Sequence, residues 1–299
     1  MQPAKSGAAA FAAGALVINA FVWGVSWWPL RQLQSYGLHP LWTTALVYLI
    51  VLFVLLTRYF SSLRDFLRHP ALWALAIAAG FTNVGFNWAV TVGDVVRVVL
   101  LFYLMPAWSV LVAWVMLGEK PSLASLLRLA LAMTGVLIVL KTPESPWPIP
   151  QGGADWLAIL GGFSFAVTNV LLRKARDAPT GSRMLAMFGG GALMAITAAL
   201  LGMSQQVVSS PALLSGSAPL AMVLIASLAL AFLVSNAALQ YGEARLMAST
   251  TSLVMLTEIL FASGSAAALG AAQFSSRIFL GGSLIVLAAV LAALAPEKK

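Results

Sequence analysis

Glu258 is the residue with the clearest chemical potential in this sequence, because it is the acidic residue that lies near the middle of a long apolar run. A carboxylate surrounded by hydrocarbon must find a partner or take up a proton. Glu258 could therefore bind the ammonium group of a solute, carry a proton, or hold its helix against its neighbours in the neutral form. The other acidic residues fall at the ends of apolar runs or between them: Asp65, Asp94, Glu119, Glu144, Asp155, Asp177, Glu243 and Glu297.

Amide and aromatic side chains recur at helical spacing in the first apolar run. Asn19, Trp23 and Trp27 stand four residues apart, which places them on one face of a helix. An amide and two indoles facing lipid would be unfavourable, so this face predicts one wall of a path for a solute. The alternative is a face that packs against neighbouring helices.

Two pairs of amides share this four-residue spacing, Asn83 with Asn87 and Asn236 with Gln240. An amide offers a donor and an acceptor, so it binds a zwitterionic solute without a charge of its own. The alternative is that these amides join helices, at about 0.6 kcal/mol for each interhelical bond. We interpret all four as candidate solute-binding residues.

Pro106 is expected to interrupt a helix, because proline lacks a backbone donor and frees a carbonyl of the preceding turn. It predicts either a hinge or a static kink. Tyr103 and Trp108 flank Pro106 and are expected to reach the solute path. In the second half of the chain, Phe165 and Asn169 repeat the aromatic and amide spacing and are further candidates.

The composition places these residues in a membrane. Of 299 residues, 61% are hydrophobic and 9% are charged, against about 25% charged in soluble proteins. A helix crosses a bilayer with about 20 mostly apolar residues, and these runs lack the alternation of barrel strands. We expect an all-α integral membrane protein with ten transmembrane helices, at residues 10–30, 40–57, 71–91, 95–117, 123–140, 154–172, 184–202, 218–239, 246–268 and 277–295. The first run has no convincing cleavage site and is expected to stay as a span.

The basic residues predict the orientation, since Lys and Arg are enriched on the cytoplasmic side of membrane proteins. With the N-terminus inside, 13 of the 17 Lys and Arg residues fall on that side, and the other four are Arg31, Arg97, Lys141 and Arg277. We therefore expect a multi-pass protein of the cell (inner) membrane with both termini in the cytoplasm. The net charge of +8 is not gathered in one patch, which argues against nucleic acid as a partner.

The two halves of the chain resemble each other. Residues 20–31 (AFVWGVSWWPLR) and 162–173 (GFSFAVTNVLLR) are identical at four of twelve positions, 142 residues apart. At a separation of 153 residues, the amide pairs meet: Asn83 with Asn236 and Asn87 with Gln240. Each half holds five of the ten expected spans. Because five is an odd number, the second half would enter the membrane from the opposite side, as in transporters with inverted repeats and a site near the midplane. The predicted repeats are residues 1–145 and 146–299.

Three stretches carry a resemblance to a known family. They are WG at residues 23–24, LMPAWSVLVAWVMLGEKPS in the fourth run, and LQYGEARLMASTTSLVMLTEILFAS around the ninth. With these, the chain resembles the drug/metabolite transporter superfamily, specifically its EamA-type members with ten spans in two repeats of five. The second half departs from the pattern twice, with Gly270-Ala271 in place of Gly-Glu and Ile259 in place of a proline. The resemblance implies export of amino acids, other metabolites or drugs, and some branches of the superfamily carry nucleotide sugars.

Other classes of protein fit the sequence less well. The chain has no cysteine, which excludes disulfide, thiolate and Cys-ligated zinc chemistry, and His39 and His69 fall between apolar runs. We therefore expect no enzyme, no metal and no cofactor. A GxxxxGK[ST] phosphate loop for ATP is missing. A channel is also disfavoured, because no run carries a filter-like sequence and inverted repeats favour alternating access.

The expected function is a secondary transporter that exports small organic metabolites by alternating access around a central cavity. Trp and Phe residues in the first, fourth and sixth runs could stack on an aromatic solute. Together with the amides and Glu258 they suit an aromatic or neutral amino acid, as in the aromatic amino acid exporter branch. The alternative is a multidrug or nucleotide-sugar transporter of the same superfamily. The expected partners are the small-molecule substrate and the lipid bilayer, with the chain acting as a monomer.

Overall fold

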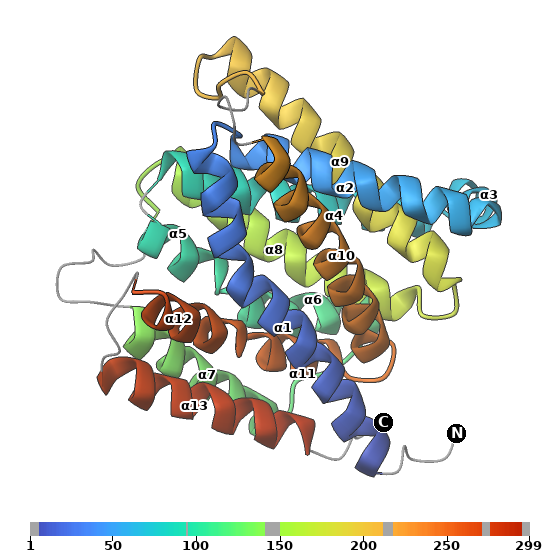
Figure 1. The fold of residues 1–299 in the computed structure, drawn as a ribbon. Helices are drawn as coiled ribbons and strands as arrows, with labels where there is room; N and C mark the ends of the chain where they lie inside the picture. The colour runs from blue at the N-terminus through green and yellow to red at the C-terminus, as the bar shows by residue number, and fades with distance from the viewer. Residues whose placement is uncertain (1–5, 94, 141–149, 212–217, 271–275, 295–299) are drawn as a thin grey trace.

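The computed structural model describes residues 6–93, 95–140, 150–211, 218–270 and 276–294. In these residues the regular secondary structure is entirely helical (Figure 1). The helices, in chain order, are α1 (Ser6–Ser35), α2 (Pro40–Arg58), α3 (Phe60–Arg68), α4 (Pro70–Val92), α5 (Val95–Phe102), α6 (Met105–Leu117), α7 (Leu123–Leu140), α8 (Gly153–Lys174), α9 (Thr180–Ser204), α10 (Ala218–Glu243), α11 (Ala248–Met255), α12 (Glu258–Ala268) and α13 (Ser276–Ala293).

The helices are those of a multi-pass membrane protein. Within the described residues, eight helical stretches are long and apolar enough to cross a membrane, and the helix at Leu123–Val139 is apolar but shorter. α4 is not among the eight; it carries the polar residues Thr82, Asn83 and Asn87. Each of the ten expected spans falls on helix, but the count of ten crossings stays a prediction. The segment between the second and third expected spans contains the short helix α3.

Small residues set the packing of the bundle. α4 packs against α8 and α9, α1 against α10 and α12, and α7 against α13. Gly85 of α4 faces Gly161 of α8, where an added Cβ would lie 2.9 Å from backbone atoms. Gly135 of α7 meets Gly281 of α13 at 2.6 Å in the same way. Without a hydrophobic driving force between helices in lipid, such close backbone contact supplies the packing energy.

Two of the long apolar stretches are interrupted near their middle. α5 ends at Phe102 and α6 begins at Met105, with Pro106 in its first turn. α11 ends at Met255 and α12 begins at Glu258. Both interruptions are single tightened turns rather than unwound chain, because Leu104 N–H bonds to Leu101 O and Thr257 N–H to Val254 O. The helix is thus interrupted beside Pro106, where the sequence predicts it, and a second interruption occurs at Glu258. A hinge at Pro106 stays a prediction.

α6, α8 and α10 end, and α9 and α11 begin, at one end of the bundle, which we call the basic end. Its residues include Arg173, Lys174, Arg176 and Arg245, and the start of α1 and the end of α13 lie there as well (Figure 1). α6 ends in the left-handed residue Gly118, at φ 71°, a conformation that glycine adopts without strain. Glu119 N–H then bonds back to Ala113 O, so a backbone hydrogen bond closes the turn that carries Glu119.

Candidate functional site

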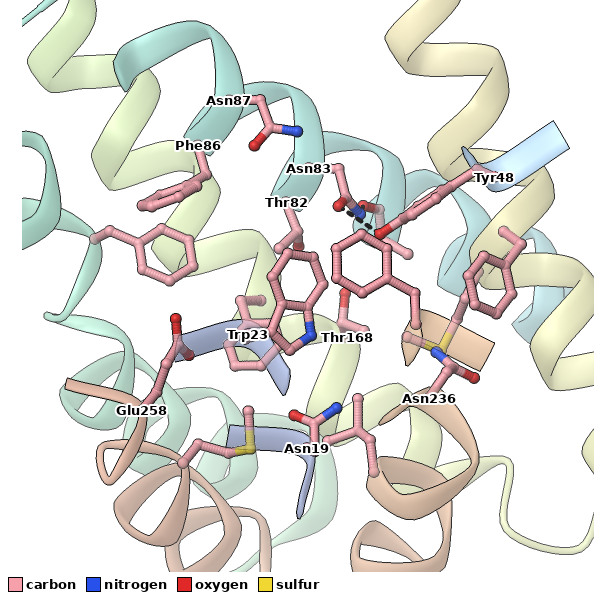
Figure 2. A pocket seen from close by; sticks show the side chains of 18 residues that line it. Asn19, Trp23, Tyr48, Thr82, Asn83, Phe86, Asn87, Thr168, Asn236 and Glu258 are labelled. Atoms are coloured by element: carbon pink, nitrogen blue, oxygen red, sulfur yellow. Dashed lines mark hydrogen bonds between the residues drawn. The ribbon is translucent and has the colours of Figure 1, made fainter. Parts of the chain in front are cut away.

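A cavity lies in the centre of the bundle, where α1, α4, α8 and α10 meet the two interrupted helices (Figure 2). The space between its walls is about 810 Å³, part of it open to solvent. α2 and α9 complete the wall. The lining residues are Asn19, Trp23, Tyr48, Ala79, Thr82, Asn83, Phe86, Asn87, Phe102, Phe165, Thr168, Met187, Phe188, Phe232, Asn236, Leu239, Met255 and Glu258.

Glu258 reaches the cavity because it is the first residue of α12, directly after the interruption. Its carboxyl group is hydrogen-bonded with the hydroxyl of Tyr103, which lies at the other interruption. The backbone of Glu258 also approaches α1 closely, since its carbonyl oxygen lies 2.7 Å from the position of a Cβ on Gly24. The acid is thus held at the point where both interrupted helices and α1 meet.

The amides of α4 are anchored to α2. The hydroxyl of Tyr48 donates to Asn83 Oδ1 at 2.8 Å, and Asn83 Nδ2 donates to the Ala79 carbonyl at 2.8 Å. Asn87 Nδ2 donates to Thr44 Oγ1 at 2.7 Å. An amide nitrogen carries two donors, and these bonds use one on each asparagine. Asn83 and Asn87 therefore keep a fixed orientation with one N–H available to a ligand.

On the other side of Trp23, Asn19 connects α1 with α10, and Asn236 of α10 contacts α9. Asn19 Nδ2 donates to Ser235 Oγ at 2.6 Å and to its carbonyl at 2.9 Å, while Asn19 Oδ1 is buried without a hydrogen-bond partner in the described part of the chain. Asn236 Nδ2 points to the sulfur of Met187 at 3.2 Å, and Asn236 Oδ1 accepts from Gln240 Nε2 at 2.7 Å. Asn19 thus presents an acceptor that a ligand could use.

Aromatic rings form the remainder of the wall. Trp23 stacks on Phe232 with ring centroids 4.6 Å apart and an interplanar angle of 21°. Phe102 meets Phe86 at 4.8 Å and Phe165 at 6.1 Å. Such pairs contribute about 0.5–1.5 kcal/mol beyond the area they bury, so they hold the wall in place. They present ring surface from several helices to the same space (Figure 2).

Seven of the twelve candidates chosen from the sequence for binding or coupling line this cavity: Asn19, Trp23, Asn83, Asn87, Phe165, Asn236 and Glu258. Their role in binding stays a prediction. The other five lie elsewhere. Trp27 donates to Ser265 Oγ of α12 at 2.8 Å. Tyr103 is buried beside Glu258, and Trp108 packs edge-on against Phe163 at 5.7 Å. Asn169 and Gln240 are buried, one helical turn beyond Phe165 and Asn236.

Sequence reasoning missed the contributions of α2 and α9, above all Tyr48 and Phe188. Tyr48 had a detectable signal, because a phenol in the middle of an apolar run needs a hydrogen-bond partner when it is buried. Thr82 and Phe86 also line the cavity and flank Asn83 by one and three positions. Phe188 and Phe232 gave no signal, since phenylalanine is equally at home in a lipid-facing or packed position.

The described lining residues of the cavity include an acidic side chain and no basic one. Glu258 is its acidic residue, and none of the described residues that line it is Lys, Arg or His. In the described residues there is also no group of His, Cys, Asp or Glu that could hold a metal ion. The wall can therefore receive a cationic group at Glu258, polar groups at the amides and a flat apolar group against the rings.

The fold and this cavity define a multi-pass, all-helical membrane protein with a polar and aromatic site enclosed by its helices. Residues 10–141 match the model of the EamA-like transporter family, so the first half of the chain is similar to these transporters. The chain is 26% identical over 163 residues to protein RarD of Streptomyces exfoliatus, and the match spans 51% of this chain and 48% of that protein. The chain thus spans about half the length of this relative.

A solved crystal structure of another protein superposes on nearly the whole chain. The TM-score is 0.75 with 18% sequence identity, and the superposition covers 99% of this chain and 100% of the other. At this identity the likeness shows a shared fold and carries no information on substrate.

Proposed function

We propose that this protein is a secondary transporter of the EamA type that moves small organic metabolites, amino acids in particular, by alternating access. One observation carries the proposal: the centre of an apolar helix bundle holds a cavity whose wall combines aromatic rings, four asparagines and one carboxyl group. Polar and ionisable groups inside a membrane are costly and mark the paths of solutes or ions. The similarity of residues 10–141 to EamA-like transporters supports the same function.

The wall suits a solute with an ammonium group. Glu258 and Asn19 Oδ1 are acceptors on neighbouring elements, and a primary ammonium group offers three donors. The free N–H groups of Asn83 and Asn87 suit a carboxylate, because each uses only one of two donors inside the protein. An amino acid carries both groups. The rings of Trp23 and Phe102 suit an aromatic or bulky neutral side chain.

Other substrates of the superfamily fit this wall less well. Phosphate groups are bound through Arg or Lys in charge-assisted hydrogen bonds, and the described lining offers neither, which argues against a nucleotide sugar. A hydrophobic cationic drug remains the second candidate. It is favoured by the aromatic wall and the single carboxyl group, and it needs no partner for a carboxylate.

The proposed arrangement has two inverted repeats, residues 1–145 and 146–299, in one membrane protein that acts as a monomer. The two interruptions support it, because Met105 and Glu258 begin α6 and α12 at the same separation of 153 residues that relates the amide pairs. The excess of Lys and Arg at the basic end supports a cytoplasmic position for that end and for both termini. Export from the cytoplasm would then start there.

The test is uptake of labelled phenylalanine and tryptophan by proteoliposomes that contain the purified protein, with lysine and a nucleotide sugar as comparison solutes. We expect saturable uptake of the aromatic pair that is lost in Asn87→Ala and retained in Trp114→Ala, a tryptophan that is 50% exposed on the outside of the bundle. Movement of a cationic drug without movement of amino acids would favour the second candidate. Movement of neither, with or without a proton gradient, would reject both.

A further inference from the structure

Two columns of polar residues lead from the cavity to the basic end. On α8, Phe165 lines the cavity and is followed at four-residue steps by Asn169 and Arg173. On α10, Asn236 lines the cavity and is followed by Gln240 and Glu243. These spacings place each column on one face of its helix. Both columns begin at the cavity and end in charged residues.

Most of the polar atoms in these columns are buried and unused. Asn169 Nδ2 and Oδ1, Gln240 Oε1 and both carboxyl oxygens of Glu243 are buried without a hydrogen-bond partner among the described residues. Asn169 and Glu243 are both 0% exposed. Each buried unsatisfied group costs about 1–3 kcal/mol, and such groups are rare enough to require an explanation. A state in which water reaches the columns would satisfy them.

Arg173 closes the columns at the basic end. Its Nε lies 2.8 Å from Glu119 Oε1, and its guanidinium group also donates to the carbonyl of Leu246. Glu243 lies close enough to interact electrostatically with Arg173 and Glu119. Through these contacts Arg173 joins the end of α8 to the turn after α6 and to the turn between α10 and α11. Separation of these ends requires that the contacts of Arg173 break.

Buried apolar side chains accompany the columns and the cavity wall. Leu239 and Met255 line the cavity at this end and are 3% and 1% exposed, and Leu172 is 0% exposed. The polar columns run beside these buried apolar side chains.

We propose that the columns on α8 and α10 are the collapsed half of the solute path, and that Arg173 with Glu119 and the Leu246 carbonyl forms the gate that keeps it closed. We name these three the Arg173 gate. The inference rests on the proposed transport function and deepens it. When the gate opens, Asn169, Gln240 and Glu243 gain water and bind the passing solute. The hydrogen bonds that their buried atoms lack make the closed state less stable.

The absence of cysteine in the chain allows a direct test by thiol labelling. Gln240→Cys and, separately, Asn169→Cys report on the columns, and Arg176→Cys reports on an exposed site at the same end. A membrane-impermeant methanethiosulfonate reagent is added to one face of the vesicles at a time. We expect slow labelling of both column reporters and fast labelling of Arg176→Cys from the face of the basic end.

Arg173→Ala should accelerate labelling of the column reporters by about tenfold to hundredfold, because hydrogen bonds to charged groups contribute about 1.5–3 kcal/mol. Glu119→Gln should act in the same direction. The charge exchange Glu119→Arg with Arg173→Glu should restore slow labelling in part, because it regains the ion pair but has no donor for the Leu246 carbonyl. Arg245→Ala is the matched control: this arginine is exposed in the α10–α11 turn and stacks over Tyr241 at 3.6 Å. It should leave the rate unchanged.

Unchanged labelling in both Arg173→Ala and Glu119→Gln, or equal acceleration by Arg245→Ala, would overturn the gate. The charge exchange guards against misfolding, since a merely damaged protein would not regain slow labelling. The labelling test and the uptake test address different proposals. Accelerated labelling without phenylalanine uptake supports the gate and rejects the amino acid substrate. Intact uptake with unaffected labelling rejects the gate alone.

Discussion

The two interrupted helices reach a similar geometry by different chemistry. In the first, Pro106 has no N–H to give to the Phe102 carbonyl, and that oxygen instead lies against the Gly162 backbone of α8. In the second, Ile259 replaces proline and keeps its own hydrogen bond to Leu256 O. There a side chain adds to the backbone bond of the turn, because Thr257 Oγ1 also donates to Val254 O at 2.8 Å.

Proline is therefore one way to interrupt such a helix, and it is not required for the interruption. The half that uses a side chain also places an acid at the first helical position, where Glu258 extends into the cavity. Its counterpart at the first position of α6 is Met105. The two interruptions therefore share a tightened turn, while only the second has an acid at the first position of the helix that follows.

The two ends of the bundle differ in the same manner. At the basic end, Glu119 follows Gly118 and pairs with Arg173. In the proposed repeat, Gly270-Ala271 stands in place of Gly118-Glu119 and Arg31 in place of Arg173; Arg31 is exposed, and Ala271 lies outside the described residues. An alanine cannot form an ion pair, so the pair of Arg173 with Glu119 has no counterpart at these two positions.

The largest effect is expected at Glu258, where the halves differ most. Glu258→Gln keeps the hydrogen-bonding shape but removes the charge, and loss of one partner of a buried charge pair costs about 2–5 kcal/mol. We expect phenylalanine uptake at low concentration to fall by about a hundredfold or more. Asp177→Asn, at an exposed acid, is the control. Normal uptake by Glu258→Gln would remove the acid from the mechanism.

A smaller loss of apparent affinity for phenylalanine is expected from changes in the aromatic wall. Trp23→Ala removes the ring that stacks on Phe232 and should raise the KM for phenylalanine by about tenfold, in line with about 0.5–1.5 kcal/mol for an aromatic pair plus lost burial. Initial rates in proteoliposomes measure this, with Trp114→Ala as the matched control. An equal change in both variants would mean that the effect is on membrane insertion.

The close approach of α5 to α8 predicts a change in stability. Gly162→Ala places a Cβ against the Phe102 carbonyl, and overpacking of this kind costs about 1–3 kcal/mol. A lower midpoint of thermal unfolding in detergent would show it. Gly14→Ala, where an added Cβ meets nothing within 4 Å, should be neutral or slightly stabilising, because alanine favours helix. If Gly162→Ala unfolds at the wild-type temperature, the contact is looser than described.

The smallest effect is expected when proline is exchanged between the two interruptions. Pro106→Ala should change stability by less than about 1 kcal/mol, because the tightened turn at Leu104 keeps its own hydrogen bonds. Ile259→Pro should cost more, since it removes the bond to Leu256 O and a side chain that is 2% exposed. Thermal unfolding of both variants decides this. Equal losses would show that proline is required in the first half after all.

Much of the helical organisation was predictable, and the cavity was predictable in part. Every expected span falls on helix, because long apolar runs have few alternatives in lipid. The first helix shows the limit. Trp23 and Trp27 were correctly expected on one face of a helix, but only Trp23 reaches the cavity, while Trp27 bonds to Ser265. Helical spacing predicts which residues share a face, but it does not predict which neighbouring helix or cavity each of them contacts.

The sequence by itself determined that apolar helices would form, that Pro106 would interrupt one of them, and that an acid, Glu258, would lie within an apolar run. These depend on local properties: hydropathy, backbone freedom and the position of an acid within a run. Only the tertiary structure decided that Tyr48 orients Asn83, that Tyr103 meets Glu258, and that Arg173 joins three helix ends. Such contacts link residues far apart in the chain, so they depend on helix packing, which no single segment encodes.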